Sequence, residues 1–221
     1  YNQYMEWDSI YQTLKEEIML LQLIPGQKIS EKNAQRFGVS RTPIRQVFHK
    51  LSEEKLLDIV PQKGTFVSLI DLKYVENKVY MRLNVEKDII NTIIDHMTQS
   101  DYQFFQYHLM KQVERSLTDE NFFLQFSELD NEFHYKFYEI AQKTQVWEIL
   151  SRLSSDYKRF CNLDIVHDEV ILDLYNDHEE LIKRIIKNDR EVAEKLITNH
   201  LTGGFLRIKQ IKMNYGKWIK R

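Results

Sequence analysis

The sequence predicts a mainly α-helical protein with one short β-hairpin in the first third of the chain. The 221 residues include only 6 Gly and 3 Pro, too few for a turn-rich all-β fold. No Pro follows residue 61, and no Gly occurs from residue 65 to residue 202, so long helices can run there without a break. Apolar residues make up 43% and charged residues 29%, the balance of an ordinary globular protein.

The first 70 residues predict three helices followed by a hairpin. Apolar residues repeat every three or four positions over 7–23, and Pro25-Gly26 ends that helix. Ser30 is a candidate N-cap for a short helix to Phe37, which Gly38 closes. Ser40 begins the next helix, which tolerates Pro43 in its first turn and runs to about Glu54.

Two short strands then follow, at 57–60 and 65–69, joined by a turn over 61–64. A short helix, a turn that contains glycine and a second helix make a helix-turn-helix, and the hairpin adds a wing. The second helix of such a unit enters the major groove of DNA. We therefore expect a winged helix-turn-helix domain over 1–70.

The remaining residues, 71–221, predict a second domain made only of helices. The apolar repeat and the polar breaks place helices at about 71–97, 101–115, 119–142, 144–164, 168–187 and 190–213. A bundle of this size can bury its own core and can hold a binding site between facing helices.

Charge is distributed unevenly along a chain whose net charge is -2. Residues 28–50 carry six bases and one acid, which is either a nucleic-acid footprint or a solvated helix face. Residues 207–221 carry six bases and no acid, which predicts a solvated, fraying tail.

Several functional classes are excluded or disfavoured by what the sequence lacks. The single Cys161 excludes a disulfide framework and a multi-cysteine zinc site. No apolar run approaches the roughly 20 residues of a membrane span. The first residues show no basic-then-apolar signal segment, so we expect a cytoplasmic protein. No nucleophile elbow, phosphate loop or dinucleotide motif is present, so an enzyme is not expected.

Four residues of the second domain could bind a divalent metal. Asp130 and His134 are four residues apart, which on a helix puts them on one face, and His178 and His200 lie on later predicted helices. Carboxylate and imidazole are suitable ligands for first-row divalent ions. Judged by spacing alone, a surface or capping role for the Asp/His pair is favoured over metal binding.

The segments Gly38-Val-Ser-Arg-Thr-Pro-Ile-Arg45 and Pro61-Gln-Lys-Gly-Thr-Phe-Val67, at this separation, resemble the DNA-binding domain of the GntR family of bacterial transcription regulators. The resemblance covers about the first third of the chain and implies binding to double-stranded DNA. It places the start of the recognition helix and the wing tip at the DNA. The expected contacts are Ser40, Arg41, Thr42, Arg45, Lys63 and Gly64.

The array formed by Asp130, His134, His178 and His200 resembles the FCD ligand-binding domain of one GntR subfamily, many members of which hold a metal with one Asp and three His. The resemblance implies a bound divalent ion, zinc first and nickel or manganese next. It also implies that Arg82 faces an effector, where a guanidinium can bind a carboxylate through two hydrogen bonds. An ion pair with Glu86, four residues later, is an equally weighted alternative for Arg82.

We therefore expect a regulator that binds a pseudo-palindromic operator as a homodimer and senses a small organic acid at a metal site. The alternatives are a regulator for which the metal itself is the signal and, far behind, a metal-dependent hydrolase. For catalysis, Glu132 is the nearest candidate base, but helical geometry points it away from the Asp130/His134 face.

Overall fold

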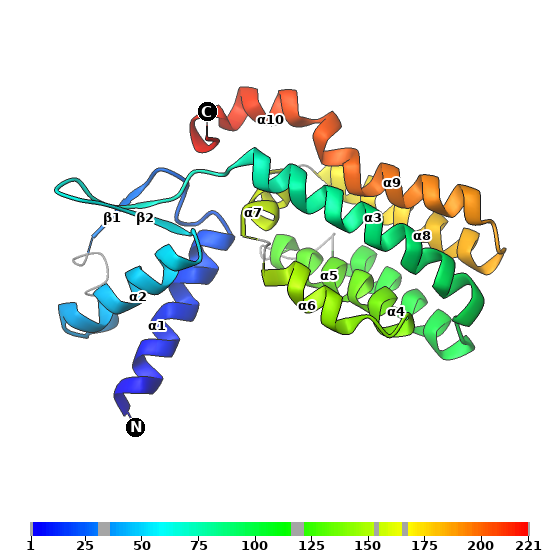
Figure 1. The fold of residues 1–221 in the computed structure, drawn as a ribbon, viewed down its shortest axis with the longest axis horizontal. Helices are drawn as coiled ribbons and strands as arrows, with labels where there is room; N and C mark the ends of the chain where they lie inside the picture. The colour runs from blue at the N-terminus through cyan, green and yellow to red at the C-terminus, as the bar shows by residue number, and fades with distance from the viewer. Residues whose placement is uncertain (1, 31–35, 116–121, 153–154, 165–167, 221) are drawn as a thin grey trace.

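The structure, a computed structural model, describes residues 2–30, 36–115, 122–152, 155–164 and 168–220. Two regions are visible in Figure 1: a small α/β region formed by the first 70 residues, and a larger bundle of helices that follows it along the chain. The predicted winged helix-turn-helix and the predicted helical bundle are thus both present.

The N-terminal region contains two long helices and a three-stranded antiparallel sheet in the order β1-β3-β2. Its elements are α1 (Asn2–Met19), β1 (Lys28–Ile29), α2 (Arg41–Glu53), β2 (Leu57–Val60) and β3 (Gly64–Val67). Strand β2 has the predicted bounds, whereas β3 begins and ends earlier than predicted because Val60 pairs with Gly64 directly after the turn. The sequence did not predict β1, because a two-residue strand leaves no periodic pattern.

The bounds of α1 differ from the prediction: the helix was expected to begin at residue 7, but it begins at Asn2. Helix α1 ends at Met19 rather than residue 23, and Leu21 has φ +60°, a left-handed backbone that helices do not continue through. The predicted helix over 30–37 lies mostly at residues 31–35, outside the described part of the chain.

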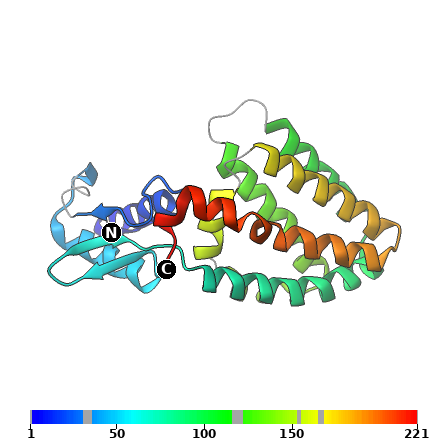
Figure 2. The same cartoon turned by 90° about the horizontal axis from the view of Figure 1, so that it is seen from above.

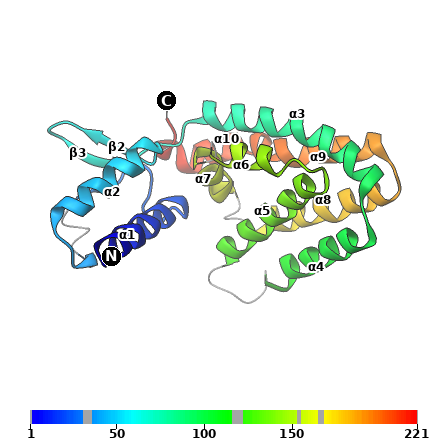
Figure 3. The same cartoon turned by 60° about the horizontal axis from the view of Figure 1, so that its bottom comes forward.

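The bundle is built from helices in the second and third thirds of the chain: α3 (Leu72–His96), α4 (Gln99–Arg115), α5 (Phe122–Ile140), α6 (Thr144–Arg152), α7 (Ser155–Asp164), α8 (Asp168–Ile186), α9 (Arg190–Leu206) and α10 (Ile208–Tyr215). Figure 3 shows α3 and α9 along one side of the bundle and α4 with α5 along the other. The helix predicted over 144–164 includes residues 153–154, which lie outside the described part of the chain, and α6 and α7 are described on either side of them.

The single helix predicted over 190–213 is wrong, because α9 ends at Leu206 and α10 begins at Ile208. The residue between them, Arg207, donates from Nε and Nη2 to the two carboxylate oxygens of Asp164 on α7, the Nε contact being 2.7 Å. This pair ties the cap residue between α9 and α10 to α7.

Aromatic residues of α4 and α5 fill the centre of the bundle. Phe105, Phe133, Phe137 and Tyr138 are fully buried, and the rings of Phe133 and Phe137 meet edge to face at 5.0 Å. Burial of a side chain of this size contributes about 1.5–3 kcal/mol. The packed rings hold α5 rigidly against α3, α8 and α9, the helices that carry the site.

The last residues of the chain return to the junction between the two regions (Figure 2). Ile70, which follows the wing, donates its backbone N–H to Trp218 O and accepts one from Lys220 N, both at 2.9 Å. Ile70 and Ile219 are buried in one apolar cluster with Phe160 and Ile211. The prediction of a solvated tail over 207–221 is therefore wrong, since this segment packs across the junction.

Within the described ranges, no helix combines the length and the apolar character that crossing a membrane requires.

Candidate metal centre and DNA-binding surface

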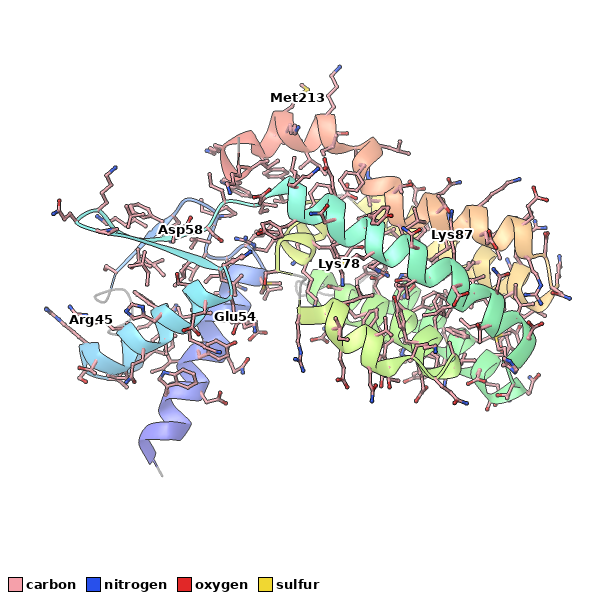
Figure 4. The ribbon with its side chains drawn as sticks, in the orientation of Figure 1. Arg45, Glu54, Asp58, Lys78, Lys87 and Met213 are labelled. Atoms are coloured by element: carbon pink, nitrogen blue, oxygen red, sulfur yellow. The ribbon has the colours of Figure 1, made fainter. Side chains whose placement is uncertain are left out.

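Helix α2 presents a polar face to solvent and an apolar face to the N-terminal core. Ile44, Val47, Phe48 and Leu51 are buried, which fixes the rotation of the helix. Arg41, Thr42 and Arg45 are consequently exposed, and Figure 4 shows Arg45 at the end of the N-terminal region remote from the bundle. Ser40 occupies the N-cap position, but its hydroxyl makes no capping hydrogen bond.

A groove of about 440 Å³ runs between α2 and the hairpin. Arg41, Arg45 and His49, spaced one turn apart, line one side of it, and Lys28 and Gly64 line the other. The structure thus brings both predicted arginines and Gly64 to one concave, basic surface. Lys28 was counted in the basic stretch 28–50 but was not among the expected DNA contacts, and neither was His49, although it follows Arg45 at one helical turn.

The wing depends on a glycine at position 64. Gly64 has φ +120°, a conformation that side chains with a Cβ rarely adopt. A Cβ on Gly64 would lie 2.8 Å from Cε of Lys28, whose stem crosses the hairpin from β1. Glycine therefore lets the Lys28 ammonium reach the groove, while Lys63 stands exposed beside it at the tip.

The four predicted metal ligands meet inside the bundle. Asp130 and His134 lie on α5, His178 on α8 and His200 on α9, and one ligand atom from each lies within 4.8 Å of all the others. His200 Nε2 is 3.1 Å from His134 Nε2 and 3.3 Å from His178 Nε2. Asp130 Oδ1 lies 3.4 Å from His178 Nε2 and 3.8 Å from His134 Nε2. Three ring nitrogens and one carboxylate oxygen therefore point at a common centre.

The other nitrogen of each ring faces a polar side chain outside the cluster. His134 Nδ1 is 3.1 Å from Glu86 Oε2 and His178 Nδ1 is 3.3 Å from Gln112 Oε1. His200 Nδ1 is 3.5 Å from Asp177 Oδ2. In metal-binding histidines the outer nitrogen donates to an acceptor and the inner one keeps its lone pair. Here His178 Nδ1 makes such a hydrogen bond, whereas His134 Nδ1 and His200 Nδ1 each approach a carboxylate without a formed bond. The sequence offered no signal for these three contacts, since each acceptor lies on a different helix from the ring that it faces.

The donor set fits a divalent first-row cation. Burial lowers the pKa of His134, and the Arg82 guanidinium lowers it further. Burial, together with the neighbouring His200 and His134 rings, lowers the pKa of His178 well below its usual range. Both rings are therefore neutral at physiological pH, the form that binds metals. Without a cation, two pairs of ring nitrogens would face each other at hydrogen-bond distance.

Arg82 lies on α3 beside this cluster and is only 5% exposed. Its Nε donates to Glu86 Oε1 at 2.6 Å and its Nη1 to Tyr157 Oη at 2.7 Å. Its Nη2 is buried and has no hydrogen-bond partner among the described residues. The predicted ion pair with Glu86 is thus formed, and one donor of the guanidinium is still available to a ligand.

Glu132 is turned away from the metal cluster. Its Oε2 lies 2.7 Å from His108 Nε2, so the carboxylate is held by α4. Among the described residues, Glu86 is thus the glutamate that lies beside the cluster, and it already pairs with Arg82.

The comparisons with known proteins agree with both regions. Residues 7–67 match the family described as bacterial regulatory proteins, gntR family, and residues 79–203 match the FCD domain. The HTH-type transcriptional repressor RspR of Escherichia coli K12 is 29% identical over 214 residues, which cover 95% of this chain and 92% of RspR.

Solved structures share the fold. A transcriptional regulator GntR from Rhodococcus sp. RHA1 superposes with a TM-score of 0.73 at 18% identity, covering 95% of this chain and 98% of the other. E. coli McbR/YncC gives a TM-score of 0.69 at 15% identity with the same coverage. Because the FCD match spans more than half of the chain and the GntR match precedes it, this protein is a DNA-binding transcription regulator of the GntR family, with an FCD domain.

Proposed function

We propose that this regulator holds a divalent metal ion with Asp130, His134, His178 and His200 and uses it, together with Arg82, to bind a small carboxylate-bearing effector. The observation that carries the proposal is the convergence of three Nε2 atoms and one carboxylate oxygen next to a buried guanidinium. Zinc is the first candidate, and nickel and manganese suit the same ligands. A six-coordinate ion with four protein ligands keeps two positions for water or for a carboxylate.

Arg82 supplies the second half of the effector site. Its Nη2, which lacks a partner among the described residues, can donate to an oxygen of a bound acid. Asp130 is the most exposed of the four ligands, with 27% of its side chain accessible, so the centre can be reached from its side. An anion there meets both the cation and the guanidinium, which favours an organic acid over a neutral ligand.

The centre serves binding rather than catalysis in this proposal. The relatives are transcription regulators, and Glu132, the carboxylate nearest in sequence, is held by His108. When bound, the metal would act as a Lewis acid that coordinates the effector carboxylate. The protein would orient the acid by charge and hydrogen bonds.

The DNA contacts proposed are Ser40, Arg41, Thr42 and Arg45 at the start of α2 and Lys63 and Gly64 on the wing. One such unit reads too few base pairs to specify a unique site in a genome, so we propose that a homodimer binds a pseudo-palindromic operator. We also propose that the protein is cytoplasmic. The domain boundary lies at residues 70 and 71. Effector binding changes operator affinity only if it favours one arrangement of the two DNA-binding domains over the other.

Metal analysis tests the site directly. The wild-type protein, a His134→Ala, His178→Ala variant and a His96→Ala control are purified in parallel, and bound metal is measured by elemental analysis. His96 is exposed at the end of α3, so its loss removes an imidazole without touching the cluster. We expect near-stoichiometric metal in the wild type and the control and none in the double variant. Full metal content in the double variant would refute the site.

Operator binding tests the DNA surface. A binding sequence is selected from random duplexes, and affinities are measured for the wild type, Arg41→Ala and Arg152→Ala, an exposed arginine of α6. A good bidentate arginine–guanine contact contributes about 1–3 kcal/mol of discrimination, so Arg41→Ala should bind at least tenfold more weakly and with relaxed preference. Unchanged affinity and preference would contradict the assignment of α2.

The same assay separates the two kinds of signal. If metal alone, added to metal-free protein, changes operator affinity fully, the ion is the signal. If metal changes operator affinity little and an organic acid then changes it strongly, the ion serves to coordinate the effector and is not itself the signal.

A further inference from the structure

Glu86 contacts both halves of the proposed site. Its Oε1 accepts from Arg82 Nε at 2.6 Å and from Tyr138 Oη at 3.1 Å. Its Oε2 lies 3.1 Å from His134 Nδ1. One oxygen of the carboxylate therefore faces the guanidinium of the proposed anion site, and the other faces a proposed metal ligand.

The surroundings enclose Glu86 and hold it in one place. The side chain is 0% exposed, and Arg82 and His134 are 5% and 1% exposed. Glu86 Oε2 and His134 Nδ1 lie 3.1 Å apart, and within the described chain neither atom has a formed hydrogen bond, so each is left to satisfy the other.

The outer contacts of the other two rings are longer. Gln112 is neutral and lies 3.3 Å from His178 Nδ1. Asp177 lies 3.5 Å from His200 Nδ1, and its side chain is 37% accessible, so water screens it. The Glu86–His134 contact is thus the shortest of the three outer contacts. Of the three acceptor side chains, Glu86 is the one that is both charged and fully buried.

A neutral imidazole has one N–H and one lone pair. His134 can bind a cation through Nε2 only when its proton is on Nδ1. A carboxylate facing Nδ1 accepts that proton in a hydrogen bond, selects this tautomer, fixes the ring and increases the basicity of Nε2.

From this geometry we infer that Glu86 is a positioning residue of the metal centre, which holds His134 through Nδ1 while Arg82 neutralises the rest of its charge. The inference rests on the proposed metal site. It also means that the metal ligand and the anion-binding arginine are joined through a single carboxylate.

The test compares Glu86→Gln with Glu132→Gln in the full-length protein. Glu132 is a matched control, because it is also a glutamate within 2.7 Å of a histidine, His108, but lies outside the cluster. Zinc affinity is measured by competition with a chelating indicator, folding by circular dichroism, and the His134 ring by ¹H–¹⁵N NMR of the zinc-bound protein. Loss of an outer partner of a metal ligand typically lowers metal affinity about 10–100-fold.

We expect Glu86→Gln to bind zinc about 10–100-fold more weakly and to shift the His134 Nδ1 proton resonance, with the Glu132→Gln protein unchanged in both. Zinc affinity and ring resonance equal to those of the control would overturn the inference while leaving the metal site intact. A wild-type protein that binds no zinc would overturn the proposed site and this inference together.

Glu86→Gln leaves Arg82 buried without a counter-charge, which can prevent folding. In that case an Arg82→Met, Glu86→Gln protein, from which both charges have been removed, is compared with Arg82→Met. The pair should differ by the same 10–100-fold in zinc affinity, and equal affinity would again overturn the inference.

Discussion

Lys78 provides a test of how the buried face of α3 is built. The residue is 3% exposed, and its Nζ donates to the carbonyl oxygen of Leu150 near the end of α6. Figure 4 shows it on the side of α3 that faces the bundle. Burial lowers its pKa from 10.5 to about 7, and Arg82, one turn further along α3, acts in the same direction.

The other charged or titratable groups near Lys78 do not reverse this effect. Glu86 on α3 and Cys161 on α7 raise its pKa, whereas Lys158 on α7 lowers it. With a pKa of about 7, the amine of Lys78 is mostly uncharged in the folded protein above that pH. In the unfolded chain the same amine stays protonated up to pH 10.5.

The sign of the pH dependence follows from proton counting. Between pH 7 and pH 10.5 the unfolded state binds a proton that the folded state does not, so stability rises with pH. Below pH 7 both states are protonated, and the folded state bears the full cost of a buried ammonium, on the order of 5 kcal/mol. Across pH 6 to pH 9 the Lys78 contribution should change by about 2–3 kcal/mol.

The experiment measures urea unfolding at pH 6, 7, 8 and 9 for the wild type, Lys78→Met and Lys87→Met. Methionine keeps the length of the chain and removes the amine, and Lys87 is a half-buried lysine of the same helix. Lys78→Met should be more stable than the wild type at pH 6, and this advantage should shrink by about 2–3 kcal/mol by pH 9. An advantage that does not change with pH would refute the reasoning.

Two further predictions concern the wing and the junction. Gly64→Ala places a Cβ 2.8 Å from Lys28 Cε at a φ of +120°, so we expect weaker operator binding with little loss of helix, measured by gel shift and circular dichroism. Equal operator affinity would show that the wing and Lys28 do not approach DNA. Ile219→Ala removes a 5%-exposed side chain from the cluster around Ile70, which should lower the free energy of unfolding by about 2 kcal/mol, and Met213→Ala, 78% exposed on the same segment, should change it little. Equal denaturation midpoints for these two variants would mean that the last residues do not hold the junction.

The local pattern was sufficient for α2 and β2 of the N-terminal region. The apolar face of α2, from Ile44 to Leu51, follows the helical repeat, and the strand bounds 57–60 follow from the turn at Pro61. The pattern also exposed Arg41 and Arg45 on the opposite face. Lys28 shows the limit: the basic stretch contained it, but its place beside the groove depends on the pairing of β1 with β3 and on the missing Cβ of Gly64.

The candidate metal ligands were named from sequence only with the help of the family resemblance. Spacing put Asp130 and His134 on one face, but the intervals to His178 and His200 carry no local signal. The packing of α8 and α9 against α5 brings them within 4.8 Å.

The sequence by itself determined what depends on neighbours along the chain: the helical periodicity, the turn at the wing, the exposed arginines of α2 and the Asp/His pair of α5. Tertiary structure alone decided what depends on contacts between distant segments. Glu86 reaches His134 across 48 residues of sequence, Arg207, between α9 and α10, pairs with Asp164, and Ile219 pairs with Ile70 across the junction. A periodic pattern records which face of a helix is buried but not which residue it meets there, because apolar burial is non-directional and partners are selected by the packing of the whole chain.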